Sequence, residues 1–442
     1  MKKIKINDFI AISVMLFGMF FGAGNLIFPP LLGKEAGSDV WIAWAGFVTT
    51  AIVLPVLGVA SIAKSGGIQK LAGRVDGVFS YVFTIATYLA IGPGLAIPRA
   101  GSTPFELIVT PYLPTDANLL LPRLLYTFIF FAVAYWLCLN PNKLMSRMGK
   151  ITTPSLMALI AIMFIFVVTS DTQSLSAVTG VYEANAFIGG FLKGYDTMDT
   201  LAALVFGLVV ANTLQRFQLS SSQLQKMTIG AGALAGVFLG AIYWILTFIG
   251  HSTSGNFPDT VNGAEILLNS TIMAIGQVGA ILLAVIFTLA CLNTCMGLLT
   301  SLSEFFNVLL PKLSYRTFLT IFVVWSFVTA NFGLNTILKI SVPILVFIYP
   351  AAIVLIMMEL TRDWFKYSRI TYQITVYAVA LISGVTALES AGISIPIITE
   401  GFRAYLPLYS LQLGWVIPFA ILIVISIISQ QFLDKEAKYP RY

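Results

Sequence analysis

Long apolar segments alternate with short polar linkers along almost the whole chain. Residues 227–250 and 341–358 contain no charged side chain, and apolar stretches of about 18 to 25 residues match the ~30 Å hydrocarbon core of a bilayer. We therefore expect an all-α polytopic membrane protein with a single transmembrane domain over residues 1–442. The pattern predicts twelve membrane-spanning helices, at about residues 7–31, 40–63, 77–98, 118–139, 150–169, 186–213, 226–250, 273–303, 317–333, 337–358, 371–389 and 409–432.

The composition of the chain agrees with this interpretation. Hydrophobic residues make up 58% of the 442 positions and charged residues only 10%, whereas a soluble domain carries about 25% charged residues. The net charge of +6 comes from Lys and Arg in particular linkers, which is typical of membrane topology and not of nucleic-acid binding. We expect membrane lipid around the chain and no nucleic-acid partner.

The distribution of Lys and Arg predicts the orientation in the membrane. With a cytoplasmic N-terminus and twelve spans, 19 of the 25 Lys and Arg residues fall in inner segments. Positive residues are enriched in cytoplasmic loops, so a multi-pass protein with both termini in the cytoplasm is expected. The outer side then holds Lys34, Arg99, Arg123 and Arg403.

Residues for enzymatic chemistry are scarce. His251 is the single histidine, and Cys138, Cys291 and Cys295 all lie in apolar segments. An intramembrane enzyme would need a cluster of acid, base or nucleophilic groups at one depth, and we therefore expect no enzyme and no cofactor. The spacing of Cys291 and Cys295 puts them on one helix face, but packing explains them better than a metal site because further ligands are missing.

The first apolar segment contains an interruption. Gly18, Gly22 and Gly24 lie within seven residues and are followed by Asn25 and the pair at 29–30, Pro-Pro. Each glycine costs about 1 kcal/mol relative to alanine inside a helix, and a break in hydrocarbon leaves backbone groups unpaired unless it lines a cavity. The pattern favours a broken helix at a functional site. Close helix packing through small residues is the alternative.

The sixth apolar segment has a matching interruption at 189–200, with the sequence GGFLKGYDTMDT. Lys193, Asp196 and Asp199 are costly inside a membrane, which makes a functional site the default hypothesis. In the alternative interpretation, residues 186–196 are an outer loop and the helix begins at Thr197.

The two interrupted segments are five spans apart and therefore run in opposite directions. This arrangement predicts an inverted repeat of about residues 7–170 and 186–358, with two extra helices at about 370–432. Broken helices at corresponding positions of two repeats indicate the binding site of a transporter. The last carbonyls of a broken helix bind a cation, and the first N–H groups of the next helix bind a carboxylate. A zwitterionic amino acid suits both ends, without a cationic side chain.

A third group of polar residues lies in the eighth segment. Thr288, Asn293 and Thr294 carry neutral oxygens that suit a sodium ion. Hydrogen bonds from Ser and Thr to the helix backbone are the alternative explanation.

Three motifs carry a resemblance to a known family. The stretches FGMFFGAGNLIFPPLLG (17–33), GYDTMDTLAALVFG (194–207) and LACLNTCMGL (289–298) resemble the branched-chain amino acid:cation symporter family, over essentially the whole chain. That family is similar to LeuT-type transporters with five-plus-five inverted repeats. The resemblance implies cation-coupled uptake of leucine, isoleucine and valine across the bacterial inner membrane.

The resemblance also implies a binding site at the two breaks. The substrate carboxylate would meet the amides of Ala23 and Gly24, and Phe20, Phe21, Tyr195 and Met198 would face the aliphatic side chain. The implied substrate-binding set is Phe20, Phe21, Gly22, Ala23, Gly24, Asn25, Tyr195, Asp196, Thr197 and Met198. The implied sodium ligands are the carbonyls of Gly18, Phe21 and Ala290 and the side-chain oxygens of Asn293 and Thr294. The family more often has a second threonine in place of Asn293 and a neutral residue in place of Asp196.

These observations predict a secondary active transporter that works by alternating access. The expected partners are a branched-chain amino acid and a coupling sodium ion, with a proton as the alternative coupling ion. Residues 251–272, the longest polar linker, are a candidate outer gate. Carriers of other neutral amino acids and channels remain as alternatives. Competition by a panel of amino acids distinguishes the first from the predicted symporter, and saturable coupled uptake distinguishes the second.

Overall fold

The computed structural model describes residues 4–114, 118–170, 175–365, 367–393 and 395–438, which are helical almost throughout and contain no β-strand. The α-helices are α1 (Ile6–Phe20), α2 (Ala23–Glu35), α3 (Val40–Val48), α4 (Leu54–Ser65), α5 (Ile68–Ala72), α6 (Gly77–Leu89), α7 (Ala96–Pro104), α8 (Leu120–Cys138), α9 (Thr153–Val168), α10 (Val181–Ala184), α11 (Ala186–Tyr195), α12 (Asp199–Gln215), α13 (Ser221–Ser252), α14 (Gly263–Ile275), α15 (Gln277–Leu309), α16 (Tyr315–Ala330), α17 (Leu334–Phe365), α18 (Arg369–Ser390), α19 (Pro396–Tyr405) and α20 (Val416–Lys438). Short 3₁₀ or π turns join several of them.

Eight continuous helical stretches of the described chain are long and apolar enough to cross a membrane, and two bent helix pairs pass the same test. These ten elements match ten of the twelve predicted segments. The other two correspond to α16 and to the apolar part of α20, Val416–Ile428, which are shorter than a full span. The number of twelve crossings therefore stays a prediction.

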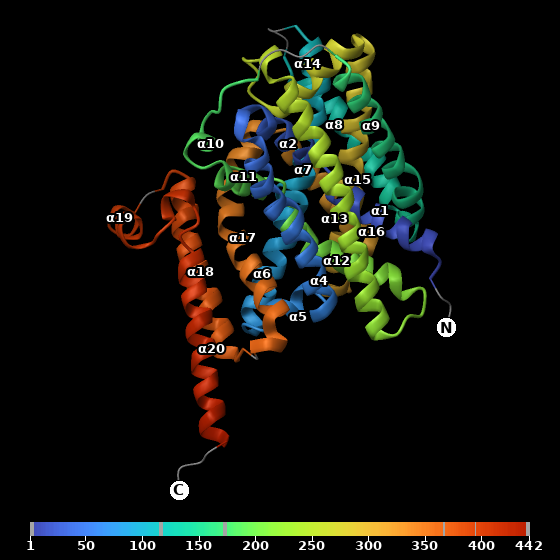
Figure 1. Cartoon of the computed structure of the whole chain (residues 1–442). Coiled ribbons are helices and arrows are strands. Elements are labelled where there is room, and N and C mark those ends of the chain that lie inside the picture. The colour runs from blue at the N-terminus through green and yellow to red at the C-terminus, as the bar shows by residue number, and fades with distance from the viewer. Residues whose placement is uncertain (1–3, 115–117, 171–174, 366, 394, 439–442) are drawn as a thin grey trace.

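Both predicted interruptions are bends. α1 and α2 meet at an angle of 72°, and α11 and α12 meet at 46°. The alternative in which residues 186–196 form a loop is wrong, because α11 is helical from Ala186 to Tyr195. Figure 1 shows the first pair running upward and the second downward, so the two broken spans are antiparallel as expected.

Two boundaries differ from the prediction. The third span bends at Gly92, whose φ and ψ are not helical, and continues as far as Pro104. Proline at position 93 removes a backbone donor there, and the chain resumes as α7 with Arg99 inside the bundle. The expected polar linker at 251–272 contains the start of α14, which begins at Gly263 behind the N-cap Asn262.

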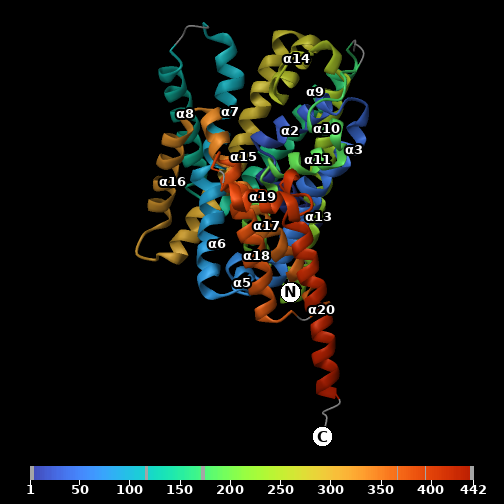
Figure 2. The same ribbon diagram turned by 90° about the vertical axis from the view of Figure 1, so that its left-hand side faces the viewer.

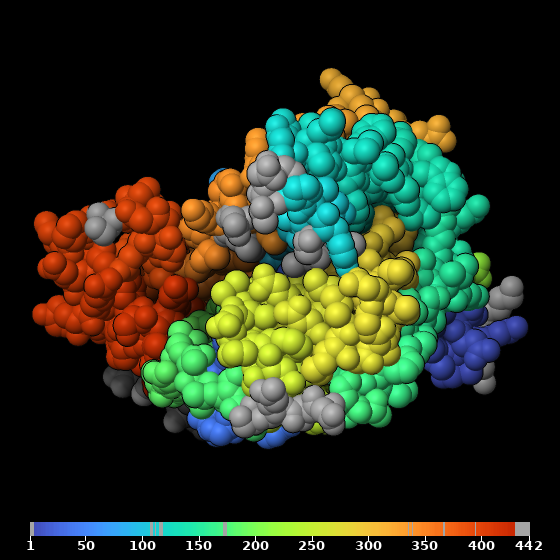
Figure 3. Space-filling view, turned by 90° about the horizontal axis from the view of Figure 1, so that it is seen from above, coloured from blue at the N-terminus to red at the C-terminus, as the bar shows by residue number. Residues whose placement is uncertain are grey.

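The bent pairs lie at the centre of the molecule, where α1 packs against α13 and α15 and α12 packs against α4 (Figures 1 and 2). α2 contacts α13 and α14 closely, and glycine makes this approach possible. A Cβ on Gly250 would overlap backbone atoms of Pro30, and one on Gly263 would overlap those of Ile27. The described parts of α18–α20 form a separate layer beside α17, which is visible from above in Figure 3. The start of α1 and the end of α20 lie toward the lower end in Figure 1.

Candidate functional site

The first break lies between Phe20 and Ala23, and the side chain of Asn25 caps the helix that follows it. The Gly22 amide donates to Asn25 Oδ1 at 2.9 Å and makes no bond to the Gly18 carbonyl, the acceptor one turn back in a continuous helix. The last carbonyls of α1 are therefore left without helical partners, and the first amides of α2 follow directly. Gly22 has a φ of −117°, so the glycine is not required by a left-handed backbone.

Close packing explains this glycine. A Cβ on Gly22 would lie 2.8 Å from Thr294 Oγ1, and one on Gly24 would lie 2.9 Å from an Arg99 nitrogen. A Cβ on Gly18 would overlap Thr153 Oγ1. Both the broken-helix hypothesis and the small-residue packing alternative therefore hold for this segment, because the break itself is packed through glycines.

The second break spans residues 196–198 and is held differently. Met198 adopts a left-handed conformation with φ of 68°, and Thr197 Oγ1 donates to the Gly194 carbonyl at 2.8 Å. The Asp196 carbonyl accepts a hydrogen bond from Arg99 Nη1 at 3.1 Å. Polar contacts thus satisfy backbone groups that the interruption of the helix releases.

Asn25 joins the two breaks. Its Nδ2 donates to Asp199 Oδ2 at 2.7 Å and also contacts the Tyr243 hydroxyl. The same Asp199 oxygen accepts a bond of 2.7 Å from Tyr243. All three side chains are at most 2% exposed. A buried carboxylate is retained only where such donors compensate its lost hydration, so the network fixes the distance between α2 and α12.

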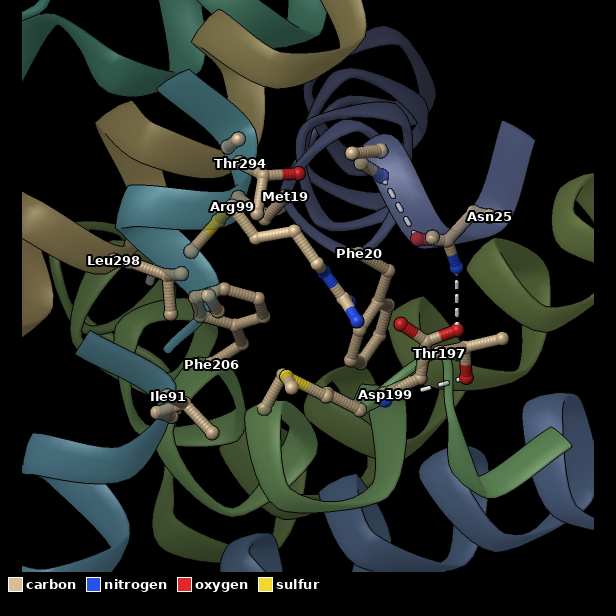
Figure 4. Close-up of a pocket in the computed structure, with 17 residues that line it drawn as sticks. Met19, Phe20, Asn25, Ile91, Arg99, Thr197, Asp199, Phe206, Thr294 and Leu298 are labelled. Carbon is tan, nitrogen blue, oxygen red and sulfur yellow. Dashed lines mark hydrogen bonds between the residues drawn. The ribbon is translucent and has the colours of Figure 1, made fainter. Parts of the chain in front are cut away.

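A small cavity lies between the two breaks (Figure 4), with a volume of about 30 Å³. A space of this size holds about one water molecule. An aliphatic amino acid does not fit until helices or side chains move apart. The lining residues are Met19, Phe20, Gly22, Ala23, Gly24, Asn25, Ile91, Ala96, Arg99, Ala100, Thr197, Met198, Asp199, Ala202, Phe206, Thr294 and Leu298.

Most of the substrate-binding set predicted from the sequence lines this cavity, namely Phe20, Gly22, Ala23, Gly24, Asn25, Thr197 and Met198. Phe21 does not, and its ring stacks on Phe17 at 5.3 Å. Tyr195 packs against Tyr349 at 4.8 Å between ring centroids. The Asp196 carboxylate lies 3.7 Å from Lys193 Nζ, and only its backbone carbonyl is engaged by a residue of the cavity wall.

Three of the predicted sodium-binding residues, Gly18, Asn293 and Thr294, lie near the end of α1. Thr294 lines the cavity and its hydroxyl oxygen is buried without a hydrogen-bond partner in the described structure. Asn293 lies next to it and accepts from Thr152 Oγ1 at 2.6 Å while donating to Thr153 Oγ1 at 3.2 Å. Gly18 touches the same Thr153, so α1, α9 and α15 meet here.

The oxygens at this meeting point suit a hard monovalent cation. Sodium binds backbone carbonyls and neutral side-chain oxygens, which are the groups that the end of α1 and the facing turn of α15 present. Ala290 lies on that turn and is fully buried. Buried hydroxyl groups normally have a partner, and among the buried hydroxyls that lack one in the described structure, that of Thr294 is the one whose residue lines the cavity. Thr152 and Thr153 were not among the predicted residues.

Sequence reasoning also missed Arg99 and the apolar wall of Ile91, Phe206 and Leu298. Arg99 was expected on the outer side because the third segment was taken to end at residue 98. The run Gly92-Pro93-Gly94 is visible in the sequence as a break in the third segment, and in the structure it bends the span without ending it. Asp199 was noticed as a costly charge but was not included in the predicted site, although its carboxylate, unlike that of Asp196, faces the cavity.

Comparison with known sequences agrees with the motifs. A family model described as "Branched-chain amino acid transport protein" matches residues 5–433. The chain is 40% identical to the branched-chain amino acid permease BrnQ of Bacillus subtilis over 420 residues, which cover 94% of this chain and 95% of the relative. It is 38% identical to the branched-chain amino acid transport system 2 carrier protein of Pseudomonas aeruginosa over 440 residues, with 98% and 99% covered.

Comparison with solved structures agrees with the fold. The transporter Mhp1, of the nucleobase-cation-symport-1 family, is similar with a TM-score of 0.58 at 16% identity, over 98% of this chain and 93% of that one. MhsT, solved in complex with L-phenylalanine, is similar with a TM-score of 0.52 at 15% identity, over 95% and 98% of the two chains. These likenesses show a LeuT-like, multi-pass membrane transporter fold. Together with the family match, they establish that the chain belongs to the branched-chain amino acid transport protein family, whose members are transporters and not enzymes.

Proposed function

We propose that this protein is a sodium-coupled symporter that carries leucine, isoleucine and valine into the cell by alternating access. The observation that carries the proposal is the meeting of two broken helices at a small cavity. The cavity is lined by charged side chains, by an apolar wall and by a buried hydroxyl without a hydrogen-bond partner in the described structure. The family and the names of the relatives support the substrate class. We further propose the bacterial inner membrane as the location, with both termini cytoplasmic and with residues 7–170 and 186–358 as inverted repeats.

The substrate would lie between the breaks. Ala23 and Gly24 line the cavity, and their amides, the first of α2, have no helical acceptors, so they suit a carboxylate at the positive end of the helix dipole. Phe20, Met198 and Phe206 would contact the aliphatic side chain. Leucine, isoleucine and valine differ by one methylene at most, which is worth about 1–3 kcal/mol in a pocket, so overlapping affinities are expected.

Sodium would lie at the junction of α1 and α15. Its proposed ligands are the carbonyls of Gly18, Phe21 and Ala290 with the oxygens of Asn293 and Thr294. One lone pair of Asn293 Oδ1 is used by Thr152, and an amide oxygen has a second. The ion would tie the two helices together beside Gly22, which touches Thr294.

Coupling would follow from this shared contact. Gly22 starts the turn whose amides are proposed to hold the substrate, and Thr294 is a proposed sodium ligand, so each ligand orders the same backbone segment. Two ligands that favour one conformation strengthen each other by the same factor. Substrate affinity should therefore rise with sodium, and sodium affinity with substrate.

The test is uptake of radiolabelled L-leucine into proteoliposomes that contain the purified chain. Accumulation against a concentration gradient is expected only with an inward sodium gradient, and unlabelled isoleucine and valine should compete. Competition by small polar or aromatic amino acids that is as strong would instead favour a carrier of other neutral amino acids. Downhill flux that does not saturate would contradict a carrier mechanism.

A proton-coupled symporter is a second candidate, because of one specific observation. Asp199 is a buried carboxylate at the cavity wall, joined to Asn25 and Tyr243, and buried carboxylates in transporters mark proton relays as well as ion sites. Uptake driven by an inward proton gradient in sodium-free buffer would support this candidate. Uptake that requires sodium at every pH would remove it.

A further inference from the structure

Arg99 is an unusual cation for the centre of a membrane protein. It lies in α7, behind the bend at Gly92, and is only 6% exposed. A charged side chain at membrane depth is costly and usually has a functional partner. Among the described residues, however, its guanidinium forms no ion pair, and its hydrogen bond goes to the backbone carbonyl of Asp196 at 3.1 Å.

The surroundings of Arg99 aim the guanidinium into the cavity. The Phe28 ring lies 6.0 Å from its central carbon, and Gly24 leaves room for it because a Cβ there would come within 2.9 Å of Nη2. A guanidinium has five N–H donors in a planar fork that matches a carboxylate. The bond to Asp196 uses one of them, and Figure 4 shows the side chain extended across the space between the two breaks.

Asp199 is the anionic group on the facing wall. Its two hydrogen bonds, from Asn25 and from Tyr243, both end on Oδ2. In Figure 4 the other carboxylate oxygen is on the side of Phe20 and Arg99. The cavity thus has a fixed cation on one wall and a fixed anion on the other, and no direct ion pair closes the space between them.

The remaining wall of the cavity is apolar. Ile91, Ala202, Phe206 and Leu298 line it together with Met19. An aliphatic α-amino acid has the complementary arrangement of a carboxylate, an ammonium group and a branched hydrocarbon on one carbon atom. Such a ligand pairs both buried charges at once, whereas a ligand with one charge leaves the other group unpaired at a large cost.

We propose that Arg99 and Asp199 form a charge clamp for the substrate zwitterion, in which the Arg99 guanidinium binds the carboxylate in a bidentate manner and the Asp199 carboxylate accepts from the ammonium group. The inference rests on the proposed transport of amino acids and deepens it. The amides of Ala23 and Gly24 then assist the carboxylate, and a cationic side chain, which the broken-helix pattern by itself does not require, becomes its main partner. Helices or side chains around the cavity must shift on binding, because the cavity holds about one water molecule.

The test compares ligands that each lack one charge. L-leucinol has no carboxylate, and 4-methyl-2-oxopentanoate has no ammonium group. Affinities of the purified full-length chain for these two and for L-leucine are measured by ligand-induced shifts in thermal unfolding, which need no labelled ligand. The wild-type protein should prefer leucine over both analogues by at least about 100-fold.

Two variants should change this preference in opposite ways. Arg99→Gln should weaken leucine binding by at least about 100-fold while leucinol binding changes little, because leucinol has no carboxylate to lose a partner. Asp199→Asn should weaken leucine but not 4-methyl-2-oxopentanoate. Arg123→Gln is the matched control, because Arg123 pairs with Glu106 at 2.8 Å outside the cavity, and its leucine affinity should stay within about threefold of wild type.

Several results would overturn or redirect the proposal. Leucine binding by Arg99→Gln within about threefold of wild type, or an unchanged preference of that variant for leucine over leucinol, would exclude the clamp. If this variant does not fold, Arg99→Lys keeps the charge but loses the bidentate fork and should bind leucine about 10-fold more weakly; unaltered affinity would exclude it. A wild-type protein that binds another α-amino acid but not leucine refutes the proposed substrate, and the same variants then test the clamp with that ligand. Binding of no α-amino acid refutes both.

Discussion

The first break is bent by 72° and has glycines at Gly18, Gly22 and Gly24, whereas the second is bent by 46° and has none at its three central residues. Yet the left-handed backbone conformation occurs in the second, at Met198, and not at Gly22. The glycines of the first break make room for Thr153, Thr294 and Arg99. The difference teaches that glycine in a broken membrane helix can indicate close approach of a neighbour and not the turn itself.

The two breaks also satisfy their backbone groups differently. Asn25 caps the first through the Gly22 amide, and Thr197 and Arg99 satisfy carbonyls of the second. One side chain, Asn25, belongs to both, since its amide nitrogen donates to Asp199. A change of this shared side chain should therefore have a larger effect than a change confined to either break.

The largest effect is expected for Asn25→Asp. The new carboxylate would face Asp199 in place of a donor at 2.7 Å, and an unpaired buried charge costs about 3–5 kcal/mol. Leucine uptake in proteoliposomes should fall by more than about 100-fold at neutral pH, which is at least 2.7 kcal/mol by the relation of about 1.4 kcal/mol per tenfold. Asn185→Asp is the matched control, because Asn185 is an exposed N-cap, where aspartate is equally suitable. Normal uptake by Asn25→Asp would show that the two breaks are not joined through this residue.

The second effect concerns the packing of the first break. Gly18→Ala would put a methyl group onto Thr153 Oγ1, and overpacking of this kind costs about 1–3 kcal/mol. The thermal unfolding temperature in detergent should fall, and the double variant Gly18→Ala/Thr153→Ala should recover at least half of the loss. Gly401→Ala, in α19, has open space around the position and should leave the unfolding temperature unchanged or slightly higher. Failure of the Thr153 change to rescue stability would place the clash elsewhere.

A smaller, more specific effect is expected for Thr294→Ala. The loss of one sodium ligand should raise the sodium concentration for half-maximal leucine uptake by about 10-fold, or roughly 1.4 kcal/mol, while the maximal rate changes less. Thr300→Ala is the control on the same helix, because its hydroxyl is also buried without a partner in the described structure but does not line the cavity. An unchanged sodium dependence of Thr294→Ala would remove this residue from the cation site.

The smallest effect is expected for Met198→Gly at the second break. Glycine relieves a left-handed conformation at a gain of about 1–2 kcal/mol, but a Met side chain that is only 3% exposed is lost, at about 1.5–3 kcal/mol. A net loss of about 1 kcal/mol in the free energy of unfolding should result. Gln218→Gly, at an exposed residue with φ of 53°, should stabilise the protein slightly. A stabilised Met198→Gly would mean that strain outweighs packing at the break.

Much of the fold was predictable because the bilayer imposes a simple length rule. Ten of the predicted segments match spans or bent pairs, and both bends occur where costly residues interrupt an apolar run. Boundaries set by packing were predicted less well. The polar and small residues around Gly263 predict a linker, but the structure has a helix that begins there. This helix is stabilised by contact with α2 and not by lipid, so its sequence lacks the pattern of a membrane span.

The candidate site was predictable only in part, for a similar reason. Glycine-containing motifs such as residues 22–25 are recognisable in the sequence, and all four of these residues line the cavity. Phe21 and Tyr195 belong to the same motifs, but their side chains pack on Phe17 and Tyr349. A motif fixes neither the direction of a side chain nor which distant helix faces it.

The sequence by itself determined that this chain is a helical membrane protein with two damaged spans, because hydrophobic length and the cost of glycine and charge in a membrane are properties of local sequence. Only the tertiary structure decided which charges meet at those breaks. Arg99 and Asp199 are 100 residues apart, and neither the single charge in the third segment nor the group of Lys193, Asp196 and Asp199 in the sixth indicates its partner. The bend at Gly92 and the link between Asn25 and Asp199 bring these two charges to opposite walls of one cavity. No local pattern encodes that meeting, because it depends on how the helices that line the cavity pack against one another.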